Sequence, residues 1–324
     1  MHIDATVPAA PAQQTDHRKP TAHQAVSGPI AMRREQQPLP GALDAPRDSF
    51  TTQHLKELSY YSDGSKDGRP LVLLHSINAA PSAFEMKPLF DHYRGSRPVY
   101  ALELPGFGFS DRSNRQYSPE LYANAINAFL TNVVKELADV VAFSLTCEFT
   151  ARAALVASER FATLTMLSPT GFSDRRLPTG STGKMLHGVF SLPGFGQGLY
   201  DLVTTRPSIR YFLRKSYVGE PPAELIDYAY ATSHQPGARY APFYFLSGQL
   251  FTPKAVETLY GKLKLPVLVL YDRDANVTFD LLPAHLAQHD NWRAVRIEPT
   301  LGLPQWERPA DCIAAMDAFW AEVG

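Results

Sequence analysis

Side chains that can carry nucleophilic or acid–base chemistry follow short apolar runs of this sequence. Ser144 follows the run at 140–143, and Asp272 and Asp274 follow the run at 267–271. A hydroxyl group becomes a nucleophile when a neighbouring base takes its proton, and a carboxylate can orient that base. Because Ser144 lies between a predicted strand and a predicted helix, we interpret it as the candidate nucleophile. The alternative interpretation is a helix N-cap, a position that serine favours.

The elements that must position these residues alternate along the chain. Short apolar runs of strand character are separated by longer segments with a helical period. This alternation predicts the α/β class, with a mostly parallel sheet and helices on both faces. Ligands of such sheets bind beyond the carboxyl ends of the strands. We expect strands at 55–61, 71–75, 99–104, 140–143, 164–167, 267–271 and 294–297, and helices at 83–93, 119–134, 145–157, 281–289 and 310–322.

The pattern divides the chain into a tail, a core and an insertion. Residues 1–50 are rich in Pro, Ala and Gln and show no periodicity, which predicts a flexible tail. Residues 51–170 and 265–324 carry the regular alternation of the core. Residues 171–264 are too many for a loop, and they predict a helical lid over one end of the sheet. Its aromatic residues are candidates for lining an apolar pocket: Tyr228, Tyr230, Tyr240, Phe243, Tyr244 and Phe245.

The motifs at the strand ends occur in a recognisable order. His75-Ser76 ends the first apolar run, and Leu104-Pro105-Gly106-Phe107-Gly108-Phe109-Ser110-Asp111 ends the second. Ala142-Phe143-Ser144-Leu145-Thr146 ends the third. With these motifs in this order, the chain from about residue 55 onward resembles the α/β-hydrolase fold superfamily of serine esterases and hydrolases. The resemblance implies that the substrate is a small ester or similar acyl compound.

The resemblance also implies a role for each site residue. Ser144 is then the nucleophile, and Asp274 is the acid that orients a protonated histidine. The backbone N–H groups of Ile77 and Leu145 form the oxyanion hole, which binds the negative oxygen of the reaction intermediate. His75 is then a structural residue of the first loop rather than a base.

The nucleophile turn departs from the family pattern at its small residues. Ala142 and Thr146 stand where two glycines are usual, and Ser76 replaces the glycine of a His-Gly pair. The branched threonine side chain predicts a more crowded turn, because strand and helix approach closely there.

The catalytic base is missing from the expected place. Aligning the family pattern on Pro304 and on Glu307-Arg308-Pro309 places the histidine at Gly302. Aligning the glycine of the family's Gly-His turn with Gly302 places the histidine at Leu303 instead. Neither residue can accept a proton, and no histidine follows His289. Deleting the base of a serine–histidine–aspartate triad costs about 10⁶ in turnover. A replacement base would have to come from elsewhere, and the candidates are His187, His234 and His285.

Composition excludes several other classes of protein. The 31 Lys and Arg nearly balance the 32 Asp and Glu, so no nucleic-acid partner is expected. No apolar run reaches the roughly 18 residues of an integral membrane segment. Cys147 and Cys312 lie far apart, and the N-terminus does not resemble a signal peptide, so we expect a cytoplasmic location. The scattered histidines indicate no metal site, and no glycine loop indicates a nucleotide cofactor.

Three functions are consistent with these observations. The chain hydrolyses a small apolar ester with another base, or it binds such a molecule without turnover, or it serves as an interaction scaffold. The gap at the histidine position makes hydrolytic competence the question to settle. The sequence does not predict an oligomeric state.

Overall fold

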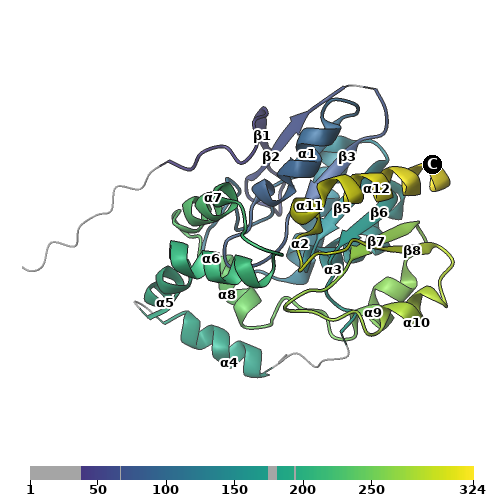
Figure 1. Cartoon of the computed structure of the whole chain (residues 1–324). Helices are drawn as coiled ribbons and strands as arrows, with labels where there is room; N and C mark the ends of the chain where they lie inside the picture. Colours follow the sequence, from purple (N-terminus) through teal and green to yellow (C-terminus); the bar gives the residue numbers. More distant parts are fainter. Residues whose placement is uncertain (1–37, 66, 174–180, 193–194) are drawn as a thin grey trace, which may run out of the picture. The chain divides into compact units, whose positions relative to one another are not determined.

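The computed structural model describes residues 38–324, except for residues 66, 174–180 and 193–194. These residues build an eight-stranded sheet in the order β1-β2-β4-β3-β5-β6-β7-β8 (Figure 1). β1 and β2 pair antiparallel, as do β2 and β4, and the remaining pairs are parallel. The predicted mostly parallel sheet is therefore confirmed. The strands are β1 (Arg47–Phe50), β2 (Leu58–Asp63), β3 (Leu71–Leu74), β4 (Val99–Leu102), β5 (Ala138–Phe143), β6 (Phe161–Leu167), β7 (Val267–Tyr271) and β8 (Trp292–Arg296).

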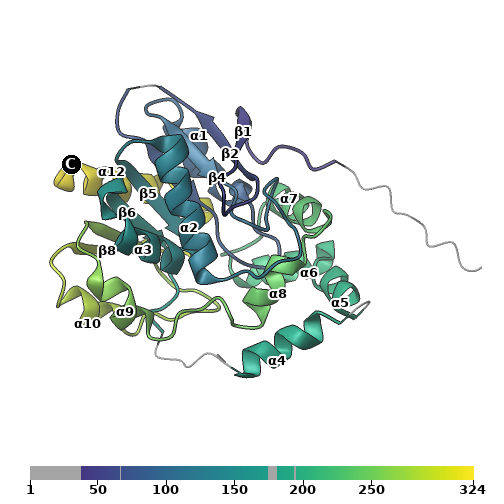
Figure 2. The same cartoon turned by 180° about the vertical axis from the view of Figure 1, so that it is seen from behind.

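The central strands are apolar along their whole length because helices cover both faces of the sheet. Val72 and Leu74 of β3 pack into one core cluster, whereas Leu71 and Leu73 pack into another on the opposite face. This division follows from the two-residue period of a strand. The helices α2 (Pro119–Phe129) and α3 (Thr146–Val156) cover the first face, and α1 (Lys87–Tyr93) and α12 (Pro309–Val323) cover the second (Figures 1 and 2).

The register of the parallel strands brings the polar strand ends to one edge of the sheet. Leu74 of β3 pairs with Leu102 of β4 and with Ala142 of β5. In turn, Leu167 of β6 pairs with Leu270 of β7. The segments that follow β3, β5 and β7 therefore begin at the same edge of the sheet, and these segments carry His75, Ser144 and Asp274.

Helices fill the interval between β6 and β7, where the sequence predicts an insertion. They gather beside the sheet in Figure 1. Tyr200 Oη donates to the carbonyl oxygen of Ala79 at 2.8 Å, and the ring of Tyr228 stacks on Phe84 at a centroid distance of 4.8 Å. These contacts attach the insertion to the segment between β3 and α1. The helices are α4 (Ser181–Phe190), α5 (Phe195–Val203), α6 (Arg206–Lys215), α7 (Ala223–Ser233), α8 (Tyr240–Leu246) and α9 (Ala255–Thr258).

The predicted flexible tail is wrong for residues 38–50. Leu39, Ala42 and Leu43 are buried, and the N–H group of Ala42 donates to Tyr61 Oη at 2.8 Å. Residues 47–50 form β1 and pair with β2 along its outer side. The error has a physical reason, since a four-residue edge strand is stabilised by pairing and shows no periodic pattern of its own. Residues 1–37 of the predicted tail lie outside the described residues.

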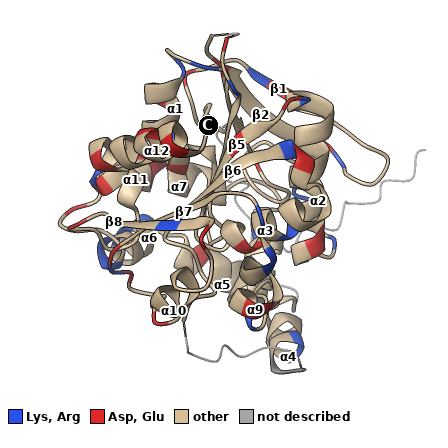
Figure 3. Ribbon diagram, turned by 90° about the vertical axis from the view of Figure 1, so that its right-hand side faces the viewer, with Lys and Arg blue, Asp and Glu red and all other residues tan. Residues whose placement is uncertain are grey.

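Charged residues of both signs are interspersed over the elements that face the viewer in Figure 3. Acidic residues gather on α12 in this view. Within the described ranges, no helix combines the length and the apolar character that a membrane crossing requires.

Candidate active site

Ser144 occupies a strained turn between β5 and α3. Its φ angle is 57°, in the left-handed region that non-glycine residues seldom adopt. The N–H group of Ser144 donates to the carbonyl oxygen of Leu167 at 2.9 Å, and its carbonyl oxygen accepts from Cys147 N at 3.1 Å. The alternative interpretation as a helix N-cap is wrong, because Leu145 stands at the cap of α3 and no side chain caps that helix.

Thr146 fits into the crowded turn by bonding across to the neighbouring strand. The side chains of Ala142 and Thr146 are fully buried. Thr146 Oγ1 donates to the carbonyl oxygen of His75 at 2.7 Å. The threonine that replaces a glycine therefore ties the serine turn to the end of β3.

His75 is a structural residue, as expected from the resemblance. Its Nε2 atom accepts from Leu104 N at 3.0 Å, which makes Nδ1 the donor to the carbonyl oxygen of Ser76 at 2.7 Å. Complete burial lowers the pKa of His75 to about 4. His75 is therefore neutral at physiological pH and has both ring nitrogens engaged.

The two backbone groups expected in an oxyanion hole have no acceptor among the described residues. Ile77 and Leu145 are buried, yet their N–H groups form no hydrogen bond there. Buried backbone donors normally find a partner, and unpaired ones are rare. A ligand oxygen is the kind of acceptor that would complete them.

A buried carboxylate beside this loop was not found from the sequence. Glu85 lies in the 3₁₀ helix η1 (Ala83–Met86) and accepts from Ser76 N at 2.8 Å, Ser76 Oγ at 3.0 Å and Asn78 Nδ2 at 2.9 Å. Burial raises the pKa of Glu85 to about 7. The sequence signal was weak, because a glutamate in the first turn after a serine cap is an ordinary helix start.

Asp274 and Gly302 are adjacent in space. Asp274 Oδ1 accepts from Asn276 N at 2.7 Å and from Val277 N at 3.3 Å. A methyl group placed on the Cα atom of Gly302 would lie 2.9 Å from Asp274 Oδ2. Gly302, where the alignment on Pro304 places the catalytic histidine, therefore lies directly against Asp274, the predicted acid.

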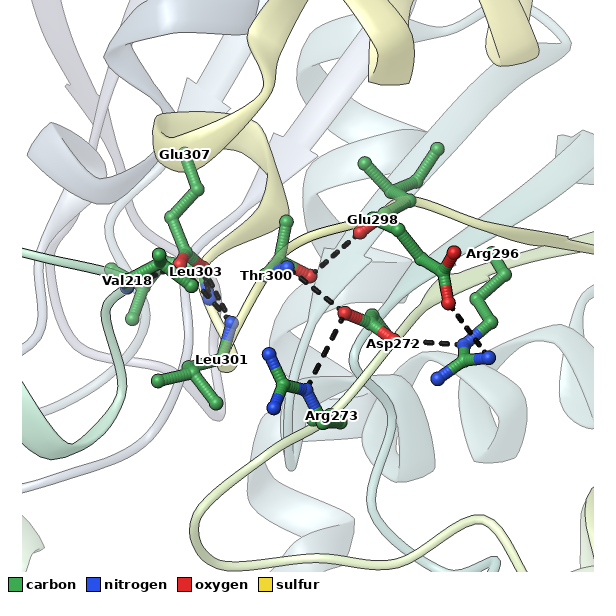
Figure 4. Close-up of polar contacts among 10 residues, drawn as sticks. Val218, Asp272, Arg273, Arg296, Glu298, Thr300, Leu301, Leu303 and Glu307 are labelled. Carbon is green, nitrogen blue, oxygen red and sulfur yellow. Dashed lines mark hydrogen bonds and ion pairs between the residues drawn. The ribbon is translucent and has the colours of Figure 1, made fainter.

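Two carboxylates fix the loop that carries Gly302 (Figure 4). Asp272 Oδ2 accepts from Thr300 N at 3.0 Å, and Glu307 Oε2 accepts from Leu301 N and Leu303 N, each at 3.0 Å. Glu307 Oε1 also accepts from Val218 N of the insertion at 2.7 Å. The backbone around Gly302 is thus held in place by its own hydrogen bonds, without a side chain at that position.

One cavity brings these residues together. Its volume is about 1100 Å³, and Ser144, Ile77, Glu85, Asp274 and Gly302 all line it. Two of the six aromatic residues proposed from the insertion, Tyr228 and Phe245, line it as well, and the other four do not. The apolar wall on the insertion side consists of Val203, Ile209, Phe212, Leu213, Leu225, Tyr228, Phe245, Leu246 and Phe251.

None of the histidines in the described part of the chain lines this cavity. The ring of His187 packs on Tyr244, and His234 Nδ1 contacts the carbonyl oxygen of Tyr230 at 2.8 Å. His285 is buried against Trp292, at a ring distance of 4.4 Å. The three candidate replacement bases are therefore used in packing elsewhere. No group of three or more His, Cys, Asp and Glu among the described residues is placed to hold a metal ion.

Comparison with known proteins identifies the family. The sequence profile of the Alpha/beta hydrolase family matches residues 71–315, so this chain belongs to that family. No curated protein matches the sequence.

Solved structures share the fold at low identity. A probable hydrolytic enzyme from Pseudomonas aeruginosa is 19% identical with a TM-score of 0.69, and the match covers 86% of this chain and 95% of that one. A putative aryl esterase from Burkholderia cenocepacia is 16% identical with a TM-score of 0.68, covering 86% and 99%. A membrane phospholipase A described as a bacterial virulence factor is 20% identical with a TM-score of 0.67, covering 86% of each chain.

Replacing Asp274 with asparagine is expected to stabilise the protein at pH 8 but not at pH 4. Burial, with a contribution from the negative Glu307, raises the pKa of Asp274 from 3.8 to about 6. The folded state then binds more protons than the unfolded chain between about pH 4 and 6, so the free energy of unfolding falls as the pH rises through this window. The asparagine side chain keeps an acceptor oxygen for the N–H groups of Asn276 and Val277, and it carries no charge.

Urea unfolding at both pH values measures the effect, with a gain of about 1–3 kcal/mol expected at pH 8. Glu322→Gln, an exposed carboxylate paired with Arg293, is the matched control and should change stability little at either pH. A stability loss in Asp274→Asn at pH 8 would show that the carboxylate has a cationic partner after all.

Proposed function

We propose that this protein binds a small, mainly apolar ester- or acyl-type molecule in the cavity above Ser144, without rapid turnover by a serine–histidine mechanism. One observation carries the proposal: Ser144, Asp274 and Gly302 line the same cavity, while none of the described histidines does. A serine hydroxyl that no base deprotonates is a poor nucleophile. The family relation supplies the acyl class of ligand, in line with the putative aryl esterase and the phospholipase among its structural neighbours.

The remaining features of the site support binding of a carbonyl compound. The unpaired N–H groups of Ile77 and Leu145 can donate to a carbonyl oxygen in a buried setting. The wall formed by the insertion is mainly apolar and suits an apolar ligand body. We propose that residues 171–264 act as the lid of this pocket. The reduced, buried Cys147 and Cys312 support a cytoplasmic location.

Slow hydrolysis with a different base is the second candidate function, and the conformation of Ser144 favours it. Strained non-glycine residues persist only where the surrounding structure holds them, and they cluster at active sites. Glu85 lines the same cavity, and its pKa of about 7 suits a general base.

A comparison of the wild type with Ser144→Ala tests the proposed function. We expect both proteins to hydrolyse p-nitrophenyl acetate at rates within about tenfold of each other, because a triad without its base loses about 10⁶ in turnover. We also expect both to bind phenyl acetate, measured by NMR chemical-shift titration.

A wild-type rate more than about 100-fold above that of Ser144→Ala would establish hydrolysis through Ser144 by another base. Glu85→Gln would then show whether that base is Glu85. Absence of both binding and turnover in folded protein would contradict the ligand-binding proposal and favour a scaffold role.

A further inference from the structure

Only one of the two carboxylate oxygens of Asp274 accepts hydrogen bonds from the described residues. Its Oδ1 atom accepts two backbone N–H groups, those of Asn276 and Val277. Its Oδ2 atom accepts no hydrogen bond and joins no ion pair within the described ranges of the chain. This oxygen faces Gly302, in the wall of the cavity.

The cationic side chains of Lys215 and Arg273 contact groups other than Asp274. The ammonium group of Lys215, which also lines the cavity, lies 4.4 Å from the centre of the Tyr211 ring. Arg273 directs its Nε atom toward Asp272 Oδ2 at 3.9 Å. The negative charge of Glu307, whose oxygens accept backbone N–H groups, also contributes to the raised pKa of Asp274. The charge environment of Asp274 therefore favours a cation.

No side chain at position 302 covers this oxygen, because the residue there is glycine. The nearest side-chain atom to a methyl group on Gly302, apart from Asp274, would be Ser216 Cβ at 3.6 Å. Asp272 and Glu307 bind the backbone N–H groups on both sides of Gly302, as described above, so the loop cannot collapse onto Asp274 without breaking those bonds. A hydrogen-bond donor of the ligand can therefore approach Asp274 Oδ2 from the cavity without meeting a side chain of residue 302.

We propose that Asp274 and Gly302 form a subsite for a protonated nitrogen, so that the ligand is an apolar molecule carrying an ammonium or azolium group. This inference rests on the proposed binding function of the cavity and specifies the ligand class. The nitrogen donates a charge-assisted hydrogen bond to Asp274 Oδ2, which is the strong kind of hydrogen bond. The apolar body of the ligand extends toward Ser144 and the wall of the insertion.

Binding of benzylamine and of benzyl alcohol, its neutral counterpart, tests the subsite. NMR titration of the full-length protein at pH 8 should show benzylamine binding about tenfold more tightly or better, because a hydrogen bond to a charged group replaces one to a neutral group. The amide signals of Asn276, Val277 and Gly302 should shift with benzylamine. Lowering the pH to 5 should remove most of this preference, because Asp274, whose burial raises its pKa to about 6, becomes protonated.

Two variants make the test specific. Asp274→Asn keeps both backbone hydrogen bonds and should abolish the preference for benzylamine over benzyl alcohol. Gly302→Ala places a methyl group against Oδ2 and should have the same effect, with a thermal melt confirming that the variant is folded. Glu322→Gln removes a distant surface charge and should behave as the wild type.

The outcomes separate this inference from the proposed function. Equal binding of benzylamine and benzyl alcohol, or a preference that survives Asp274→Asn, overturns the subsite but leaves the apolar cavity as a binding site. Failure of benzylamine, benzyl alcohol and phenyl acetate to bind folded wild-type protein overturns both proposals.

Discussion

Replacing Gly302 with histidine is expected to raise the hydrolysis of p-nitrophenyl acetate about 100-fold, a typical contribution of one positioned general base. Gly302 lies against Asp274, which can orient the new imidazole, and both residues line the cavity with Ser144. The backbone sets a cost, because φ at Gly302 is 137° and an L-residue is strained there. The expected gain is therefore well below the full effect of a triad.

Controls separate the base from the other effects of the substitution. Gly302→Gln introduces a side chain with the same backbone strain and no titratable group, and it should remain inactive. Gly302→His combined with Ser144→Ala should return to the wild-type rate. Activity in Leu303→His but not in Gly302→His would show that the other alignment of the last loop is correct.

The second large effect is expected for stability. Replacing Glu307 with alanine should lower the free energy of unfolding by about 2–4 kcal/mol, because the N–H groups of Leu301, Leu303 and Val218 all lose their acceptor. The loss also separates the loop of Gly302 from the insertion, since Val218 belongs to the insertion. Urea unfolding at pH 7 measures the change.

Matched variants define the origin of this effect. Glu307→Gln keeps one acceptor oxygen and should lose less stability than Glu307→Ala. Glu298→Ala removes an exposed carboxylate of the same loop, whose ion-pair partner among the described residues is Arg296, and it should change stability by less than about 0.5 kcal/mol. A loss in Glu298→Ala as large as that in Glu307→Ala would show that overall loop charge, rather than the three hydrogen bonds, stabilises the loop.

The position of Glu307 also links stability to the site. Its negative charge contributes to the raised pKa of Asp274, so Glu307 acts as a positioning residue with an electrostatic effect on the subsite. Glu307→Gln should therefore lower the pKa of Asp274, which NMR titration of its carboxyl carbon would detect. A merely structural role for Glu307 would leave that pKa unchanged.

The fold was predictable because its signals are local. The buried parallel strands are apolar runs in the sequence, and those predicted at 71–75 and 267–271 agree with β3 and β7 to within one residue. The place of Ser144 between strand and helix was predictable for the same reason. The strand β1 was not predictable, because it depends on pairing with β2 and on burial of Leu39 and Leu43 by distant residues.

The sequence by itself determined the order of the motifs, the candidate nucleophile and the absence of a histidine from the last loop. These features depend on residue identity and on spacing along the chain. Only the tertiary structure decided that Gly302 lies against Asp274, that Glu85 lines the cavity, and that His187, His234 and His285 do not. Such proximities depend on strand register and on how helices pack over the sheet, and these long-range contacts leave no periodic pattern in the sequence.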